Sequence, residues 1–266
     1  MIEAFGSPFM QKAFIAGILV SVLTGIISVF IVLRKMSFIG AGISHAAFGG
    51  IAIGFFTGIN PLLTAIIYSI VIAFGIESTS RKGRIAEDVS IGIFYSVSMA
   101  IGIAIVSMSK SYNVDLFGYL FGNILAITKG EILLTLITFM AVTSVIIIFL
   151  KELFLSTYNE ELAKVSGIRV KFLNTLFLVA LSVSIVISIR VVGIIMVSAL
   201  LVIPGAAARL FAKSLLSMIV ISCVVAFVSV IAGLLISYAY DIASGASIVI
   251  TSAVIFFISL LFKKKI

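Results

Sequence analysis

Residues 10–33 read MQKAFIAGILVSVLTGIISVFIVL, an almost uninterrupted apolar run that ends at the basic pair Arg34-Lys35. A helix needs about 20 apolar residues to cross a hydrocarbon core about 30 Å thick, because each residue rises about 1.5 Å. The same character runs through the chain: of 266 residues, 62% are hydrophobic and 11% are charged, and the mean hydropathy is +1.38. This composition excludes a soluble enzyme, a disordered chain and a secreted disulfide-rich domain. It predicts an all-α polytopic membrane protein.

Nine stretches are long and apolar enough to be membrane spans: 10–33, 40–58, 61–78, 89–109, 131–150, 171–189, 191–209, 214–240 and 245–262. Pro204-Gly205 interrupts the seventh stretch, so we expect a broken or partly re-entrant helix there. The alternative count is eight full spans and one irregular segment. No soluble domain separates these stretches, which predicts one transmembrane domain over residues 1–266.

The basic residues predict the orientation of the chain. If the first helix ends inside at Arg34-Lys35, fourteen of the 18 lysines and arginines fall on the inner side and four on the outer side. Inner loops of membrane proteins carry such an excess, so we expect the N-terminus outside and the C-terminus inside. An odd number of spans gives the same arrangement. The net charge of +8 is therefore interpreted as loop charge and not as a nucleic-acid interface.

The chain has a single histidine, His45, about ten residues beyond the basic pair and between a third and a half of the way across the membrane. An ionisable group at that depth is costly, which makes it a functional candidate. Imidazole is also the commonest side-chain ligand for divalent transition metals. The alternative is a histidine that is hydrogen-bonded to a neighbouring helix and serves packing alone.

Acidic residues are scarce, and two of them are expected at the outer boundary: Asp115 and Asp241. Each could receive a cation from outside, or be an ordinary solvated loop acid. Together with His45 they would form a set of oxygen and nitrogen donors that suits manganese, iron or zinc, although both lie higher in the membrane than His45. Glu87 and Asp88 begin the fourth stretch, where we expect them to cap the positive end of a helix rather than to bind metal.

Small residues recur every four positions beside His45: Gly42, Ala46, Gly50, Gly54 and Gly58. This spacing predicts a groove along one helix face that another backbone can approach closely. Helix packing is sufficient to explain the groove. We therefore expect His45 to face protein or a transport pathway rather than lipid.

The longest polar stretch, near residues 151–170, is expected in the cytosol. Within it, the segment from Asn159 to Gly167 has the pattern of a short amphipathic helix that ends at the glycine. The 266 residues contain no GxxxxGK[ST] phosphate-binding loop. An intramembrane histidine, a cytosolic amphipathic helix and the lack of this motif together indicate a transport subunit driven by a separate motor, not an enzyme.

The chain resembles the permease family of ABC importers for divalent transition metals (zinc, manganese or iron). The resemblance covers nearly the whole chain and rests on RKMSFIGAGISHAAFGGIAIG at 34–54, EDVSIGIFYS at 87–96, DLFGYLFGNIL at 115–125, NEELAKVSG at 159–167, VVGIIMVSALLVIPGAAAR at 191–209 and SGASIVI at 244–250. It implies a type II ABC importer-like permease fold in a prokaryotic plasma membrane. It also implies a homodimer with two cytosolic ATP-binding subunits and an extracytoplasmic metal-binding lipoprotein. The metal would be the substrate, with no permanently bound cofactor.

The resemblance also assigns roles to residues. The short helix looks like the family's coupling helix, which docks on the ATPase, and its contact residues would be Asn159, Glu160, Glu161, Ala163 and Gly167. His45 falls on the family's SHA motif, where a metal-coordinating role is implied.

One position departs from the family pattern. Many members have an aspartate four residues before that histidine, where this chain has Ala41. His45 then needs other partners, such as Asp241 or Asp115, or holds the metal more weakly. Two alternative functions stay open: a permease for iron-siderophore or cobalamin substrates, and a secondary transporter or channel that needs no motor.

Overall fold

The computed structural model describes residues 8–108 and 127–262, and regular structure within these ranges is helical. Its elements are α2 (Pro8–Leu33), α3 (Ile39–Thr57), α4 (Pro61–Gly83), α5 (Glu87–Met108), α7 (Lys129–Ile148), α8 (Leu150–Tyr158), α9 (Glu160–Val165), α10 (Val170–Val192), α11 (Ile194–Leu200), α12 (Ile203–Arg209), α13 (Leu215–Tyr240) and α14 (Ser244–Leu261). Eight of these helices are long and apolar enough to cross a membrane. The prediction of an all-α polytopic membrane protein is confirmed.

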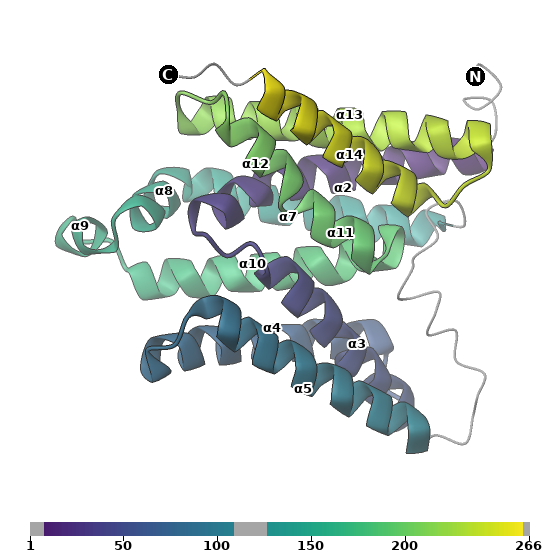
Figure 1. Cartoon of the computed structure of the whole chain (residues 1–266). Helices are drawn as coiled ribbons and strands as arrows, with labels where there is room; N and C mark the ends of the chain where they lie inside the picture. The colour runs from purple at the N-terminus through teal and green to yellow at the C-terminus, as the bar shows by residue number, and fades with distance from the viewer. Residues whose placement is uncertain (1–7, 109–126, 263–266) are drawn as a thin grey trace.

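The seventh predicted span consists of two short helices, α11 and α12. This agrees with the alternative count of eight full spans and one irregular segment. Pro204 lies in the first turn of α12 and has no N–H to donate to the preceding turn, which ends α11. Gly205 follows at a close approach to α2: its N–H donates to Ser28 Oγ at 2.8 Å, and an added Cβ would lie 2.6 Å from the Ser28 carbonyl oxygen. In Figure 1, α11 and α12 together lead from the end of α10 to the start of α13.

Three spans form the interior of the bundle. In the most apolar window of each helix, 67% of α2, 72% of α3 and 72% of α10 is buried, against 22% of α5, 22% of α7 and 17% of α14. Figure 1 shows α3, α4 and α5 as one group, with α10 between this group and the remaining helices. The outer helices therefore present apolar faces that suit lipid or a second protein.

Two glycines bring α3 and α4 into backbone contact. A Cβ added to Gly50 would lie 2.7 Å from Ala65 Cα, and one added to Gly54 would lie 2.6 Å from Pro61 Cα. Gly42 packs instead against Ile91 of α5. Gly58 does not have the packing role expected for it. It ends α3 with φ at 72°, and nothing lies within 4 Å of its added Cβ. Its function in the fold is the left-handed helix cap.

One short helix has no counterpart in the sequence-based expectations. Helix α8 follows α7 after a break at Phe149, whose φ and ψ of −102° and 21° are not helical. Only Asn159 separates α8 from α9. Figure 1 shows α9 projecting beyond the ends of the other helices, at the end of the bundle where α4 meets α5.

Candidate functional site

His45 lies in a groove of about 370 Å³ between α3 and α5. The lining residues are Phe38, Ala41, Gly42, His45, Asp88, Ile91, Gly92 and Tyr95. The imidazole meets the Tyr95 ring edge to face, with centroids 4.7 Å apart and an interplanar angle of 85°. Its Nδ1 atom is shielded from solvent and has no hydrogen-bond partner among the described residues. A histidine that serves packing alone would normally use this nitrogen in a hydrogen bond, so the geometry does not identify His45 as a packing residue.

Asp88 is the carboxylate that shares this groove, which the sequence-based reasoning missed by assigning it only a capping role. It does stand in the first turn of α5 with Glu87. It precedes Tyr95 by seven residues, so it lies about 10 Å nearer the start of α5 than the ring that contacts His45. A second depression of about 260 Å³ shares Phe38, Asp88 and Ile91 with the first and adds Lys35, Met36, Ser37 and Glu87. The groove therefore leads from His45 past Asp88 toward the end of the bundle that carries α9.

The structure does not place Asp241 in the groove of His45. Asp241 ends α13 as a left-handed cap with φ at 53°, and its side chain is exposed at the turn into α14. Asp115 lies outside the described residues. Within residues 8–108 and 127–262, no group of three or more His, Cys, Asp and Glu side chains could hold a metal ion. A metal at His45 would thus have few protein ligands from one chain.

The segment expected to couple to an ATPase is a capped helical turn. Asn159 accepts a hydrogen bond from the Leu162 N–H at 2.9 Å, which caps the start of α9. At its end, the Ile168 N–H donates to Ala163 O and the Gly167 N–H to Lys164 O, at 3.0 and 3.1 Å. This is a Schellman motif, and the φ of 78° at Gly167 meets its need for a left-handed residue. Short helices are marginal alone, so these caps give α9 a defined shape.

Charged contacts join α9 to α4. Glu160 lies 2.9 Å from Lys164 Nζ within α9 and 3.6 Å from Arg81 Nη2 of α4. Arg81 also approaches Glu77 one turn earlier, at 3.4 Å. The hydrogen bond from Lys164, followed by the nearby arginine charges, lowers the pKa of the Glu160 carboxyl, while its partial burial opposes this. The side chains are partly exposed, so each pair contributes little alone and the set acts as a network.

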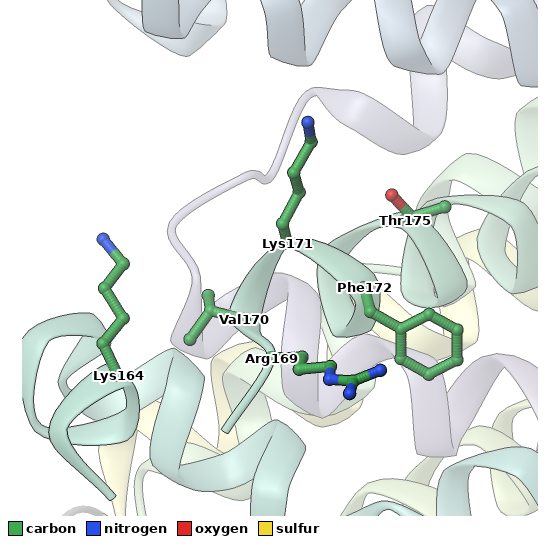
Figure 2. A pocket seen from close by; sticks show the side chains of 6 residues that line it. All are labelled: Lys164, Arg169, Val170, Lys171, Phe172 and Thr175. Carbon is green, nitrogen blue, oxygen red and sulfur yellow. The ribbon is translucent and has the colours of Figure 1, made fainter. Parts of the chain in front are cut away.

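A shallow depression of about 620 Å³ lies between α9 and the start of α10 (Figure 2). It is lined by Lys164, Arg169, Val170, Lys171, Phe172 and Thr175. Figure 2 shows Lys164 and Lys171 extending in the same direction, whereas Arg169 runs beside the Phe172 ring. The three cations do not converge on one point, so we treat the depression as part of the basic surface beside α9.

Comparison with known proteins gives the family. A model described as the ABC 3 transport family matches residues 6–263. The manganese transport system membrane protein MntC of Listeria monocytogenes is 39% identical over 257 residues, 97% of this chain and 91% of that protein. The high-affinity zinc uptake system membrane protein ZnuB of Haemophilus influenzae is 34% identical over 253 residues, 95% of this chain and 97% of that protein.

A solved structure agrees with these sequence comparisons. The structure of PsaBC from Streptococcus pneumoniae in complex with Fab matches with a TM-score of 0.88 at 37% identity, covering 99% of this chain and 95% of that one. The family match spans nearly all 266 residues, including the His45 groove and the α8–α9 segment. This multi-pass membrane protein therefore belongs to the ABC 3 transport family.

Proposed function

We propose that this chain is the permease subunit of an ATP-driven importer for a divalent transition-metal ion: manganese, zinc or iron. The observation that carries the proposal is the groove that His45 and Asp88 line together. Nitrogen and oxygen donors of this kind suit manganese, zinc and ferrous ions. The similarity to manganese and zinc permeases supports the same substrate class.

The energy source is a separate pair of cytosolic ATP-binding subunits that dock on the α8–α9 segment through Asn159, Glu160, Glu161, Ala163 and Gly167. The chain has no phosphate-binding loop of its own. The basic residues collect at the end of the bundle that carries α9, which supports a cytosolic position for that end. The N-terminus is then outside and the C-terminus inside.

The remaining partners follow from the same orientation. An extracytoplasmic metal-binding protein delivers the ion to the outer end, where Asp241 and Asp115 could receive it. A second copy of the chain covers the open side of the His45 groove, since a partly exposed imidazole would otherwise face hydrocarbon. ATP binding drives alternating access, and the ion leaves along the groove past Asp88. A sparse ligand set suits a pathway that must release its ion.

Uptake into reconstituted vesicles tests this function. Vesicles that contain the permease and its ATP-binding subunits are expected to take up one of zinc, manganese and iron when ATP is present on the ATPase side, with the binding protein on the other. Competition among the three ions identifies the preferred metal. Uphill movement by the permease alone would contradict the proposal and favour a secondary transporter. Uptake of an iron-siderophore or cobalamin but of no free metal would favour the alternative ABC substrate class.

The role of Asp88 has its own test. We expect Asp88→Asn to lower the initial rate of metal uptake about tenfold, because the neutral amide no longer attracts the cation leaving His45. Asp88→Glu is the control, because it keeps the carboxylate charge at the same position of the groove. Equal uptake rates for the two variants would remove Asp88 from the pathway. The complex with the ATPase should form normally in both.

A further inference from the structure

Arg34 lies where α2, α8 and α10 meet, and the proposed function assigns it no role. It follows the last residue of α2, and its guanidinium group reaches α8 and α10. Nε donates to Thr157 Oγ1 at 3.1 Å, and Nη1 donates to Asn174 Oδ1 at 3.0 Å. The guanidinium carbon lies 4.4 Å from the centroid of the Phe177 ring. Residues far apart in the sequence are thus held by one side chain.

The contact with α8 is made immediately before the coupling helix. Thr157 lies in the last turn of α8, two residues before Asn159, which caps α9. The Thr157 hydroxyl donates to Leu153 O at 2.7 Å, so its lone pairs are left to accept from Arg34. Leu153 is 1% exposed and anchors the same turn in the core. A displacement of α9 therefore acts on Arg34 through a short, hydrogen-bonded turn.

The other side of Arg34 leads to the metal groove. Lys35 has a left-handed φ of 60°, and the buried Met36 donates its N–H to Ile31 O at 3.1 Å, which fixes the turn. Helix α3 begins at Ile39 and carries His45. The path from Arg34 to α3 is four residues long, and the Ile39 N–H at its end donates to Met36 O at 3.0 Å. A shift of Arg34 is therefore passed to α3.

Because the guanidinium group of Arg34 is largely buried, its charge depends on its hydrogen-bond partners for stabilisation. Burial lowers the pKa of Arg34 to about 10, an effect that the carboxylates of Glu87 and Glu77 partly oppose. The group stays charged at neutral pH. Its Nη2 atom is shielded from solvent without a hydrogen-bond partner among the described residues. A charged group enclosed in this way is costly to leave with broken hydrogen bonds, so its partners are expected to move with it.

We infer that Arg34 is a positioning residue that transmits the movement of the α8–α9 coupling segment to α3 and the His45 groove. The inference rests on the proposed function. It does not require Arg34 to contact the metal or the ATPase. A planar guanidinium can stack on Phe177 while it donates to Thr157 and Asn174 in fixed directions, whereas a lysine ammonium is a point charge on a flexible stem. The geometry of the junction thus demands arginine rather than any cation.

Thr157→Val and Arg34→Lys are the test variants, with Ser156→Ala as the matched control. Ser156 donates to the same carbonyl oxygen, Leu153 O, at 3.0 Å, whereas the hydrogen bonds of Arg34 go to Thr157 and Asn174. Each variant is reconstituted with the ATP-binding subunits and the binding protein. ATP hydrolysis and metal uptake are measured on the same vesicles. We expect both test variants to hydrolyse ATP while the number of ions imported per ATP falls about tenfold, and Ser156→Ala to keep the wild-type ratio.

Hydrogen exchange separates transmission from simple loss of structure. In the wild-type complex, binding of a non-hydrolysable ATP analogue should change exchange in residues 156–167 and also in residues 39–50. In Thr157→Val and Arg34→Lys, the change at 156–167 should persist and the change at 39–50 should be lost. An unaltered ratio of uptake to hydrolysis in both variants would overturn the role of Arg34. If the wild-type complex itself imports no metal, the proposed function fails instead.

Discussion

Replacing His45 with alanine should abolish metal uptake while the permease still assembles with its ATP-binding subunits. In the proposed function the imidazole is the nitrogen ligand of the α3–α5 groove. Its Nδ1 atom has no hydrogen bond within the described residues that the substitution would break. The side chain is also only partly buried, so its loss leaves a small defect in packing. We expect uptake at the background of empty vesicles, measured with the preferred metal at saturating concentration.

The control for this experiment is Ser44→Ala. Ser44 is the preceding residue on α3 and is 0% exposed, and it does not line the groove. This variant should import metal at the wild-type rate. Size-exclusion chromatography of each complex and its ATPase activity show whether assembly is intact. Normal uptake by His45→Ala would exclude the histidine from the transport site, whatever the metal.

A leucine at position 50 is expected to prevent α3 and α4 from packing. Even a Cβ at Gly50 would lie 2.7 Å from Ala65 Cα and 2.9 Å from Tyr68 Cβ, and backbone atoms cannot give way as flexible side chains do. Overpacking of this kind typically costs about 1–3 kcal/mol, and we expect Gly50→Leu to be at the upper end or to fail to fold. Thermal unfolding of the detergent-purified permease measures the loss.

Gly130→Leu is the matched substitution for comparison. Gly130 is exposed near the start of α7, and nothing lies within 4 Å of its added Cβ. Its unfolding midpoint should stay close to that of the wild type, since the new side chain meets no neighbour. If Gly50→Leu and Gly130→Leu unfolded at the same temperature, the close approach of α3 to α4 would not contribute to stability.

Hydropathy was sufficient to predict the spans because each depends on one local property, an apolar run of helical length. The interruption at Pro204-Gly205 was also predictable, because a proline breaks the helix locally, whatever packs around it. Helix α8 was missed because its start depends on a backbone break at Phe149 within an otherwise helical sequence. Gly58 was grouped with the packing glycines because spacing alone does not distinguish a packed face from a left-handed cap.

The candidate site was only partly predictable. The depth and uniqueness of His45 single it out in the sequence, but the neighbours of His45 come from a helix that follows some 40 residues later. The pairing of α3 with α5 cannot be deduced from either helix, so Asp88 was interpreted as a cap. The role of Asp241 in metal binding stays a prediction, and the structure places its side chain outside the His45 groove. Arg34 was interpreted as an orienting charge because its contacts with Thr157 and Asn174 join segments more than 120 residues apart.

The interruption between α11 and α12 bears on how the chain is made. Leu200 and Leu201 at this break are 0% exposed, so the main-chain groups that lose their helical partners there are enclosed by protein rather than by acyl chains. One of those groups, the Gly205 N–H, is hydrogen-bonded to Ser28 of α2, which is synthesised some 170 residues earlier. The two half-helices are consequently poor candidates for independent release into the bilayer during translation. They should remain beside the insertion machinery until they pack against α2.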